Sequence, residues 1–535
     1  MEKQNIRAEI EKGFLTVGIE FGSTRIKTVA IDSNFNTVAS GYYEWENKLE
    51  NDFWTYSVND VWVGLQKSYS NMTDQIESIY QLRLKKIKSI GISAMMHGYL
   101  AFDEHDDLLV PFRTWRNNYT NEAAASLRTI FDFNIPERWS IAHLYQALLD
   151  KEPHIEEITY ITTLAGYVHW YLTGEKVLGI GDASGMFPID PTEKNYRGDL
   201  MEKFDGLLQT YGLDKNISSL LPEVLIAGDE AGCLTREGAK LLDPKGDLEA
   251  GIPFCPPEGD AGTGMVATNS IAVKTGNISA GTSAFAMIVL ENSLEDVYPE
   301  IDIVTTPSGS EVAMVHTNNC TSDLNAWVNL FDELLNLLNI SISRDDLYGQ
   351  LMNHSLEGED DLGGLLSFGF VSGENITDVS DGRPMFVRMP DSRMNLANFM
   401  KTHLYSSFST MKIGIDLLLQ REKIQIDSLV AHGGIFKTKG VAQNILAAAT
   451  ESPITVMETA NDGGAWGMAI LAKYMTDKRN ISLEDYLKSF VFREIKASTA
   501  APTEKDIQNY KNYIKRYKSA LPLEQKASQF ILGDD

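Results

Sequence analysis

Residues 14–32 read FLTVGIEFGSTRIKTVAID, and this stretch decides the fold class. Residues 14–22 and 26–32 are rich in valine, isoleucine and phenylalanine, which favour strands. The short turn Ser23-Thr24-Arg25 lies between them. The stretch therefore predicts a β-hairpin.

The chain after this hairpin alternates between predicted strands and helices. Residues 37–46 (TVASGYYEWE) predict a third strand, and residues 88–103 contain another strand that glycines interrupt. Apolar residues from 60 to about 80 have helical spacing, and an alanine-rich helix is expected from residue 120. Alternation of this kind indicates an α/β protein.

A second hairpin is predicted at residues 271–291 (IAVKTGNISAGTSAFAMIVLE). Its turn, Gly281-Thr282-Ser283, corresponds to Gly22-Ser23-Thr24 in the first hairpin. The repetition suggests a duplicated domain with a cleft between the halves and a boundary near residues 262–270. Chance similarity between two short hairpins is the alternative.

Length, charge and cysteine content exclude several classes of protein. A chain of 535 residues is expected to form two or more domains. Lys+Arg 47 against Asp+Glu 74 gives 47 − 74 = −27, which argues against non-specific binding to nucleic acid or to anionic membranes. Three widely spaced cysteines indicate neither a disulfide framework nor a zinc site. With no signal-peptide pattern and no long apolar run, we expect a cytoplasmic protein.

Glycine-rich segments raise the question of phosphate binding. No Gly-Lys dipeptide occurs, so a Walker A loop is excluded. Residues 262–267 (GTGMVA) match G-x-G-x-x-A but follow a loop rather than a clear strand, so a dehydrogenase is only a weak alternative. The turns at 22–24, 281–283 and 432–434 (HGG) resemble ordinary tight turns when each is taken alone. Together they indicate sites where backbone N–H groups, assisted by Lys27, bind anionic oxygens.

Two carboxylates stand out from the acidic background. Asp260 lies in the Pro/Gly-bound loop CPPEGDAGTG at the proposed domain boundary, where it could accept a proton from an attacking hydroxyl. Glu20 ends the strand that leads into the first turn and could hold Mg²⁺ through water. Most other carboxylates are expected to be solvated surface groups.

Two polar segments could contact a sugar. His97, in Met95-Met96-His97-Gly98, follows a predicted strand, although a histidine there is more often a structural hydrogen-bond partner. Residues 113–118 (RTWRNN) suit a sugar face or a surface loop equally well. Nearby aromatics are expected to form core or lid packing: Trp45, Trp54, Tyr56 and Trp62.

These pieces, in this order, resemble the FGGY carbohydrate kinases of the actin–hexokinase superfamily over about residues 14–490. Eight segments carry the resemblance: GIEFGSTRIKTVAID (18–32), SAMMHGYLAFD (93–103), TWRNNYT (114–120), GDASGMFPID (181–190), EGDAGTG (258–264), GNISAGTSAFAMI (276–288), FVSGENIT (370–377) and the long run from AHGG to AILA (431–472).

The resemblance implies an α/β fold with two actin-like (ribonuclease H-like) domains and a catalytic cleft between them. Residues 1–266 would form the N-terminal kinase domain, 267–490 the C-terminal nucleotide-binding domain, and 491–535 a helical tail. It also implies ATP-dependent phosphorylation of a 2-ketopentose at its terminal hydroxyl, with D-xylulose first and L-ribulose second. A small-molecule sugar and ATP are the expected partners, and Mg²⁺ is the expected cofactor. A homodimer is expected because the family commonly forms one.

Carried over by position, the resemblance assigns a role to each candidate residue. Asp260 would be the general base, and Glu20 and Asp260 the Mg²⁺ ligands. The sugar would contact residues from three segments: Met96, His97, Trp115, Arg116, Asn117 and Asp260. The phosphates and nucleotide would contact Ser23, Thr24, Lys27, Gly281, Thr282, Gly433, Gly434 and Asn461.

The chain also departs from the family pattern at named positions. Glu20 replaces an aspartate, Asn117 an aspartate and Tyr119 an arginine, which leaves the metal arrangement and the choice of pentulose open. The aromatic stretch around residues 42–62 is unlike that of xylulokinases. A kinase for another polyol or a sugar acid, or a weakly catalytic sugar- or nucleotide-binding sensor, are the alternatives.

Overall fold

The computed structural model describes residues 2–457, 463–477 and 480–530. The chain forms two compact units that interleave in sequence. Unit 1 comprises Met1–Ile271, Asp302–Val312 and Ala460–Glu494, and unit 2 comprises Ala272–Ile301, Ala313–Thr459 and Ile495–Asp535. Division of the sequence at 1–266, 267–490 and 491–535 stays a prediction.

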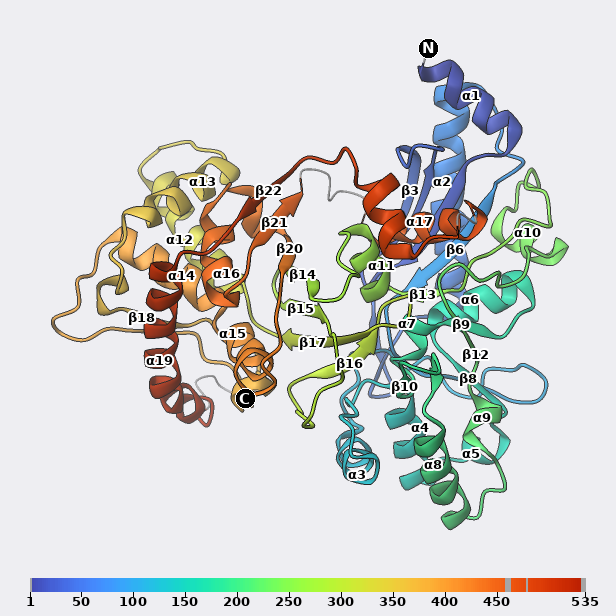
Figure 1. The fold of residues 1–535 in the computed structure, drawn as a ribbon, viewed down its shortest axis with the longest axis horizontal. Helices are drawn as coiled ribbons and strands as arrows, with labels where there is room; N and C mark the ends of the chain where they lie inside the picture. The colour runs from blue at the N-terminus through green and yellow to red at the C-terminus, as the bar shows by residue number, and fades with distance from the viewer. Residues whose placement is uncertain (1, 458–462, 478–479, 531–535) are drawn as a thin grey trace. The chain divides into compact units, whose positions relative to one another are not determined.

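Unit 1 is built on a five-stranded sheet with the order β13-β6-β1-β2-β3 (Figure 1). Its strands are β1 (Thr16–Phe21), β2 (Arg25–Ile31), β3 (Thr37–Glu44), β6 (Ser89–Ala94) and β13 (Glu258–Gly259). β1 and β2 form the expected antiparallel hairpin, whereas β1, β6 and β13 run parallel. The prediction of a hairpin at 14–32 is confirmed.

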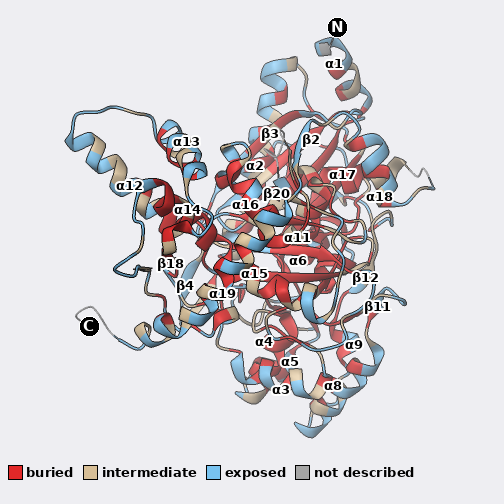
Figure 2. Cartoon of the chain, turned by 60° about the vertical axis from the view of Figure 1, so that its left-hand side comes forward, coloured by how far each residue is buried: buried red, intermediate tan, exposed pale blue. Residues whose placement is uncertain are grey.

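Helices cover both faces of this sheet. The long helix α2 (Val58–Tyr80) packs on β2 and β3, and α17 (Gly463–Asp477) packs on β1, β2 and β6. Alternate residues of the strands face the two layers: Val17, Ile19 and Phe21 of β1 belong to a large buried cluster with α2 residues. Figure 2 shows the buried residues gathered along these strands and helices.

The strand expected at 88–103 differs from its prediction. β6 runs unbroken through Gly91, and a short β7 (Leu100–Phe102) follows. A Cβ on Gly91 would lie 2.6 Å from Met468 Cε of α17 and 2.8 Å from Cys255 Sγ. This glycine therefore permits close packing of the helix instead of ending the strand.

Part of the arrangement of unit 1 recurs in unit 2. In a seven-stranded sheet, the four neighbouring strands β15-β14-β20-β21 repeat the order β2-β1-β6-β13, and β22 adds an antiparallel strand beside β21. Their bounds are β14 (Thr275–Ala280), β15 (Ala284–Val289), β20 (Ser428–His432), β21 (Ile454–Met457) and β22 (Ala497–Ala500). β14 and β15 form a hairpin, and β14, β20 and β21 run parallel, as β1, β6 and β13 do. The predicted α/β class and the second hairpin are confirmed.

The remaining principal helices surround the two sheets. In unit 1 they are α1 (Glu2–Lys12), α3 (Asn121–Phe131), α4 (Ser140–Leu149), α6 (Leu164–Thr173), α7 (Ile180–Ala183), α8 (Gly198–Thr210), α10 (Arg236–Leu242) and α11 (Asp260–Ala267). In unit 2 they are α12 (Ser322–Leu337), α13 (Arg344–His354), α14 (Leu396–Ser407), α15 (Ser409–Asp416), α16 (Val441–Thr450) and α19 (Glu504–Ala527).

The C-terminal segment is not purely helical. β22 pairs antiparallel with β21 before the long helix α19 begins. α19 buries Tyr510, Tyr513 and Tyr517, and the Tyr510 hydroxyl donates to the Tyr405 carbonyl of α14 at 2.8 Å. The segment is thus part of unit 2. Throughout the described ranges, no helix has the length and apolarity needed to cross a membrane.

Candidate functional site

The carboxyl ends of three parallel strands bring together the main candidates of unit 1. Register pairs Glu20 of β1 with Ser93 of β6, and Gly259 of β13 with Ala94 of β6. Asp260 directly follows β13, and Met96 and His97 follow β6 after one further residue. Since parallel strands end at one edge of the sheet, residues distant in sequence meet there.

Asp260 is the first residue of α11, and its carboxylate is held by backbone N–H groups. Oδ1 accepts a hydrogen bond from Met96 N–H at 3.1 Å. Burial raises the pKa of Asp260, while the N–H groups of Met96 and Ala261 act in the opposite direction. The arrangement orients the carboxylate and makes it a better proton acceptor than a solvated aspartate.

Glu20 lies close enough to Asp260 for the two charges to interact. Its Oε2 accepts from Ala465 N–H of α17 at 3.2 Å, and Lys27 is its cross-strand partner on β2. Burial, followed by the charge of Asp260, raises the pKa of Glu20 to about 7, whereas Ala465 N–H and Lys27 lower it. Bringing a cation near both carboxylates would relieve this repulsion.

The pair fits the way proteins hold Mg²⁺. Among the described residues there is no cluster of three or more His, Cys, Asp or Glu side chains that could bind a metal. Mg²⁺, however, is usually bound by one or two carboxylates together with substrate phosphates and water. Glu20 and Asp260 meet that requirement.

His97 has an unusual backbone conformation for a non-glycine residue. Its φ is 68°, in the left-handed region, and its Nδ1 lies 3.2 Å from the Gly185 carbonyl oxygen. The ring stacks on buried Trp139 with centroids 6.3 Å apart. A strained backbone conformation of this kind persists only where the surrounding structure enforces it, and such conformations cluster at functional sites.

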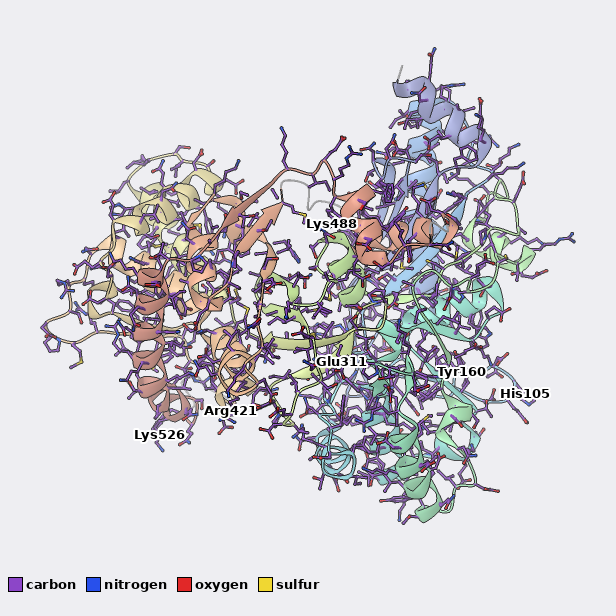
Figure 3. The ribbon with its side chains drawn as sticks, viewed as in Figure 1. His105, Tyr160, Glu311, Arg421, Lys488 and Lys526 are labelled. Carbon is purple, nitrogen blue, oxygen red and sulfur yellow. The ribbon has the colours of Figure 1, made fainter. Side chains whose placement is uncertain are left out.

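His105 differs from His97 in its surroundings. It projects outward from the loop after β7 (Figure 3), with its side chain 73% exposed.

Two buried carboxyl groups near Asp260, those of Glu258 and Asp182, were not predicted from the sequence. Glu258 accepts from the N–H groups of Asp182 at 3.0 Å and Gly181 at 3.4 Å. Asp182 accepts from the Thr163 hydroxyl at 2.6 Å, and its other oxygen has no partner in the part of the chain that is described. Burial raises the pKa of Glu258 to about 8 and that of Asp182 to about 7. Their only signal in the sequence was that Glu258 is the first residue of EGDAGTG and that Asp182 lies within GDASG.

The first turn has backbone donors available. Gly22 N–H donates to the Arg25 carbonyl at 3.0 Å and closes the turn. The N–H groups of Ser23 and Thr24, both exposed residues, donate to no residue that the structure describes. These groups can bind an anionic oxygen without further rearrangement.

The segment expected to contact sugar is pinned by Asn117. Its buried side-chain amide donates to the carbonyls of Trp54 at 2.8 Å and Thr114 at 3.0 Å, and its Oδ1 accepts from Trp54 N–H at 2.8 Å. Arg116 lies over the Trp54 ring at 4.8 Å, and Trp115 is 37% exposed. Asn117 thus orders the segment that carries Trp115 and Arg116, and contact with sugar by any of the three stays a prediction.

In unit 2 the second turn and the HGG segment share one sheet edge. Register pairs Ser279 of β14 with His432 of β20, so Gly281 and Gly433 follow neighbouring strands. Gly433 has φ 131°, and a Cβ there would lie 2.0 Å from the Ala280 carbonyl oxygen. Only glycine allows this approach. Gly281, Thr282, Gly433 and Gly434 therefore gather in unit 2, whereas Asn461 lies outside the described residues.

A loop from elsewhere in unit 2 supports the second turn. Cys320 N–H donates to the Thr282 carbonyl at 2.8 Å, and the Thr321 hydroxyl donates to the Gly281 carbonyl at 2.7 Å. Glu374 of the FVSGENIT segment holds this loop, because its Oε2 accepts from Asn318 N–H at 2.9 Å and Asn319 N–H at 3.3 Å.

Two family models match consecutive parts of the chain. Residues 15–267 match the N-terminal domain of the FGGY family of carbohydrate kinases, and residues 276–476 match the C-terminal domain of that family. The xylulose kinase of Haemophilus influenzae is 22% identical over 513 residues, which cover 94% of this chain and 98% of that protein.

Solved structures show the same fold with different sugars in their names. A xylulose kinase from Lactobacillus acidophilus superposes with a TM-score of 0.77 at 16% identity, covering 96% of this chain and 99% of that one. A gluconate kinase from the same organism gives a TM-score of 0.77, 16% identity and coverage of 96% and 99%. These similarities confirm the two-domain, actin-like fold predicted from the sequence.

Proposed function

Since the chain belongs to the FGGY family of carbohydrate kinases and is therefore a sugar kinase, we propose that its acceptor is a 2-ketopentose. The γ-phosphoryl group of ATP would pass to the terminal hydroxyl, giving the pentulose 5-phosphate and ADP. D-Xylulose is the first candidate because the relative from Haemophilus influenzae, at 22% identity, is a xylulose kinase.

One observation carries the chemical assignment: Asp260 is held by Met96 N–H at the carboxyl edge of the sheet. As the acceptor oxygen bonds to phosphorus, Asp260 takes the hydroxyl proton. The bond between phosphorus and the bridging oxygen of ADP breaks, and the electrons leave with ADP. Because phosphoryl transfer depends chiefly on positioning and charge stabilisation, a fixed carboxylate and fixed N–H donors are what the reaction requires.

The remaining candidates have binding roles in this proposal. Met96, His97, Trp115, Arg116 and Asn117 orient the sugar. Phosphate oxygens bind the N–H groups of Ser23 and Thr24 and the ammonium group of Lys27. The nucleotide also contacts residues of unit 2: Gly281, Thr282, Gly433 and Gly434, with Asn461 proposed from the sequence alone.

Glu20 and Asp260 would hold Mg²⁺ together with phosphate oxygens and water. The ion, when bound, neutralises negative charge on the phosphates. Glu20 is then ionised, because a neighbouring cation lowers the pKa of a carboxyl group.

The identity of the sugar needs a direct test. L-Ribulose is the second candidate, since Asn117 and Tyr119 depart from the xylulokinase pattern. A sugar acid is the third, because the gluconate kinase matches the fold as closely as the xylulose kinase does, each with a TM-score of 0.77.

A coupled ADP-release assay over five acceptors separates these candidates: D-xylulose, L-ribulose, D-ribulose, glycerol and gluconate. We expect the highest kcat/KM with D-xylulose. A higher value with L-ribulose would move the assignment to the second pentulose, and activity confined to glycerol or gluconate would overturn the pentulose proposal.

We also propose that the protein is cytoplasmic and that it forms a homodimer. The three cysteines are free thiols, which agrees with a reducing cytoplasm. A homodimer is proposed from the resemblance, and sedimentation equilibrium of the full chain tests it.

A further inference from the structure

A strap formed by residues 45–56 contacts the first phosphate turn at three successive carbonyls. Trp45 Nε1–H donates to the Gly22 carbonyl at 2.7 Å, and Trp45 N–H donates to the Thr24 carbonyl at 3.2 Å. The Tyr56 hydroxyl donates to the Ser23 carbonyl at 2.6 Å. All three carbonyls of the turn are therefore bound by one short segment.

The two aromatic residues of the strap form a rigid, buried pair. Their rings stack with centroids 4.2 Å apart and an interplanar angle of 27°. Trp45 is 6% exposed and Tyr56 is 2% exposed. Trp45 also packs against Phe21 of β1 at 6.0 Å. Stacked, buried rings have few rotamers available, so they hold the turn in one conformation.

Fixing the carbonyls has a consequence for the amides of the same turn. The N–H groups of Ser23 and Thr24 have no acceptor among the described residues. With the carbonyls engaged by Trp45 and Tyr56, the peptide planes cannot rotate freely, and the donors stay preorganised for an anion.

The other end of the strap is bonded to the segment expected to bind sugar. Trp54 exchanges hydrogen bonds with the Asn117 side chain in both directions, each at 2.8 Å. Thr114 N–H donates to the Trp54 carbonyl at 3.1 Å, and Asn47 Nδ2 donates to the Thr114 hydroxyl at 3.2 Å. The strap thus connects residues 114–117 to the phosphate turn within unit 1.

We propose that this strap couples occupancy of the sugar segment to the geometry of the phosphate turn, with Trp45 and Tyr56 as positioning residues. Sugar bound at residues 114–117 steadies the strap and, through it, the N–H donors that receive the phosphate. Without sugar, the contacts of the strap alone hold these donors, so they bind phosphate less tightly than in the sugar complex. This inference rests on the proposed function.

The first test removes one hydrogen bond from the turn. Tyr56→Phe deletes the bond to the Ser23 carbonyl while keeping the stacked ring. At saturating sugar we expect KM for ATP to rise about fivefold, which corresponds to the loss of one ordinary hydrogen bond, while Kd for sugar measured without nucleotide stays nearly unchanged. Tyr69→Phe is the matched control, because the Tyr69 hydroxyl is also buried but has no partner in the described chain.

Thermal unfolding of both variants separates positioning from stability. We expect Tyr56→Phe and Tyr69→Phe to melt within a few degrees of each other. If Tyr56→Phe keeps the wild-type KM for ATP, or if Tyr69→Phe raises it equally, the positioning role is wrong.

The second test measures the coupling itself. In the wild type, saturating sugar should tighten binding of a non-hydrolysable ATP analogue, and this factor should shrink severalfold in Tyr56→Phe and in Asn47→Ala, which cuts the opposite end. An unchanged factor in both variants would overturn the coupling. If the wild type phosphorylates none of the five acceptors, the proposed function fails instead, and analogue binding by Tyr56→Phe without sugar still tests the turn.

Discussion

Two neighbouring carboxylates acquire different properties at the candidate site. Asp260 is oriented by Met96 N–H, whereas Glu20 is held by Ala465 N–H and lies opposite Lys27. Burial raises the pKa of both, and for Glu20 the charge of Asp260 adds to the effect. Environments of this kind allow one carboxylate to accept a proton while the other serves a cation.

For Asp260 we predict that Asp260→Asn abolishes sugar phosphorylation, because the amide cannot accept the hydroxyl proton. The variant should still accept the Met96 N–H bond through its Oδ1. Nucleotide binding, measured by calorimetry, should survive. Normal turnover by Asp260→Asn would contradict the assigned mechanism.

For Glu20 we predict that Glu20→Gln reduces kcat by at least about tenfold and raises the Mg²⁺ concentration needed for half-maximal rate. Glutamine keeps an acceptor for Ala465 N–H but carries no charge. Initial rates over a Mg²⁺ titration measure the effect. A Mg²⁺ dependence identical to that of the wild type would exclude Glu20 as a metal ligand.

Asn117, which stands where the family has an aspartate, orders its segment through its side-chain Nδ2. Its Nδ2 donates to two carbonyls, those of Trp54 and Thr114. In Asn117→Asp a carboxylate oxygen would face these carbonyls, so we predict a loss of about 1–3 kcal/mol in unfolding free energy and a raised KM for sugar. Asn118→Asp, at an exposed neighbour, is the control. Equal effects in the two variants would contradict the role of the Asn117 amide.

At the scale of elements, both turns depend on segments that follow them at a distance in sequence. The strap at 45–56 holds the first turn, and the loop at 318–321 holds the second through Gly281 and Thr282. That loop depends in turn on Glu374, which is 1% exposed. Hairpin turns are local structures, but their conformation here is set by long-range contacts.

Glu374 should make stability depend on pH. Burial raises its pKa from 4.5 to about 7 in the folded chain. Between these values the folded state keeps a proton that the unfolded state has lost, so the free energy of unfolding falls as pH rises, by up to roughly 1.4 kcal/mol per pH unit. Glu374→Gln should reduce the slope measured between pH 5 and 7 in urea unfolding but leave the contributions of the other buried carboxyl groups, whereas Glu333→Gln, at an exposed glutamate, should leave the whole slope unchanged. A slope in Glu374→Gln equal to that of the wild type would contradict the role of Glu374.

For the whole molecule, the dominant property is a net charge of −27. The candidate phosphate sites use backbone N–H groups of two turns and Lys27, so they need little overall positive charge. The surplus carboxylates therefore serve mainly solubility, at the cost of mutual repulsion in the folded state.

We predict that moderate salt stabilises the protein. Raising NaCl from about 20 to about 200 mM shortens the Debye length and screens this repulsion, so Tm should rise by a few degrees. KCl should act alike, because screening does not depend on the cation. A Tm that falls with salt would mean that attractive ion pairs outweigh the net repulsion.

Local patterns were sufficient to predict both hairpins, helix α2, the alternation of strands and helices, and the turns with their glycines. Strand and helix periodicity is a property of neighbouring residues, and turn residues act through their own φ and ψ. The same reasoning selected Asp260 and Glu20 as candidates, because each stands next to such a turn or strand end, and their roles stay predictions.

Contacts between distant residues were decided only by the tertiary structure. The pairing of Glu258 with the backbone of Gly181 and Asp182, the stacking of His97 on Trp139 and the strap's hold on the first turn all join separate elements. The sequence alone had indicated only core or lid packing for Trp45 and Tyr56. The spacing of residues along the chain does not predict such contacts. Two elements meet only as a result of how the whole sheet and its helices pack.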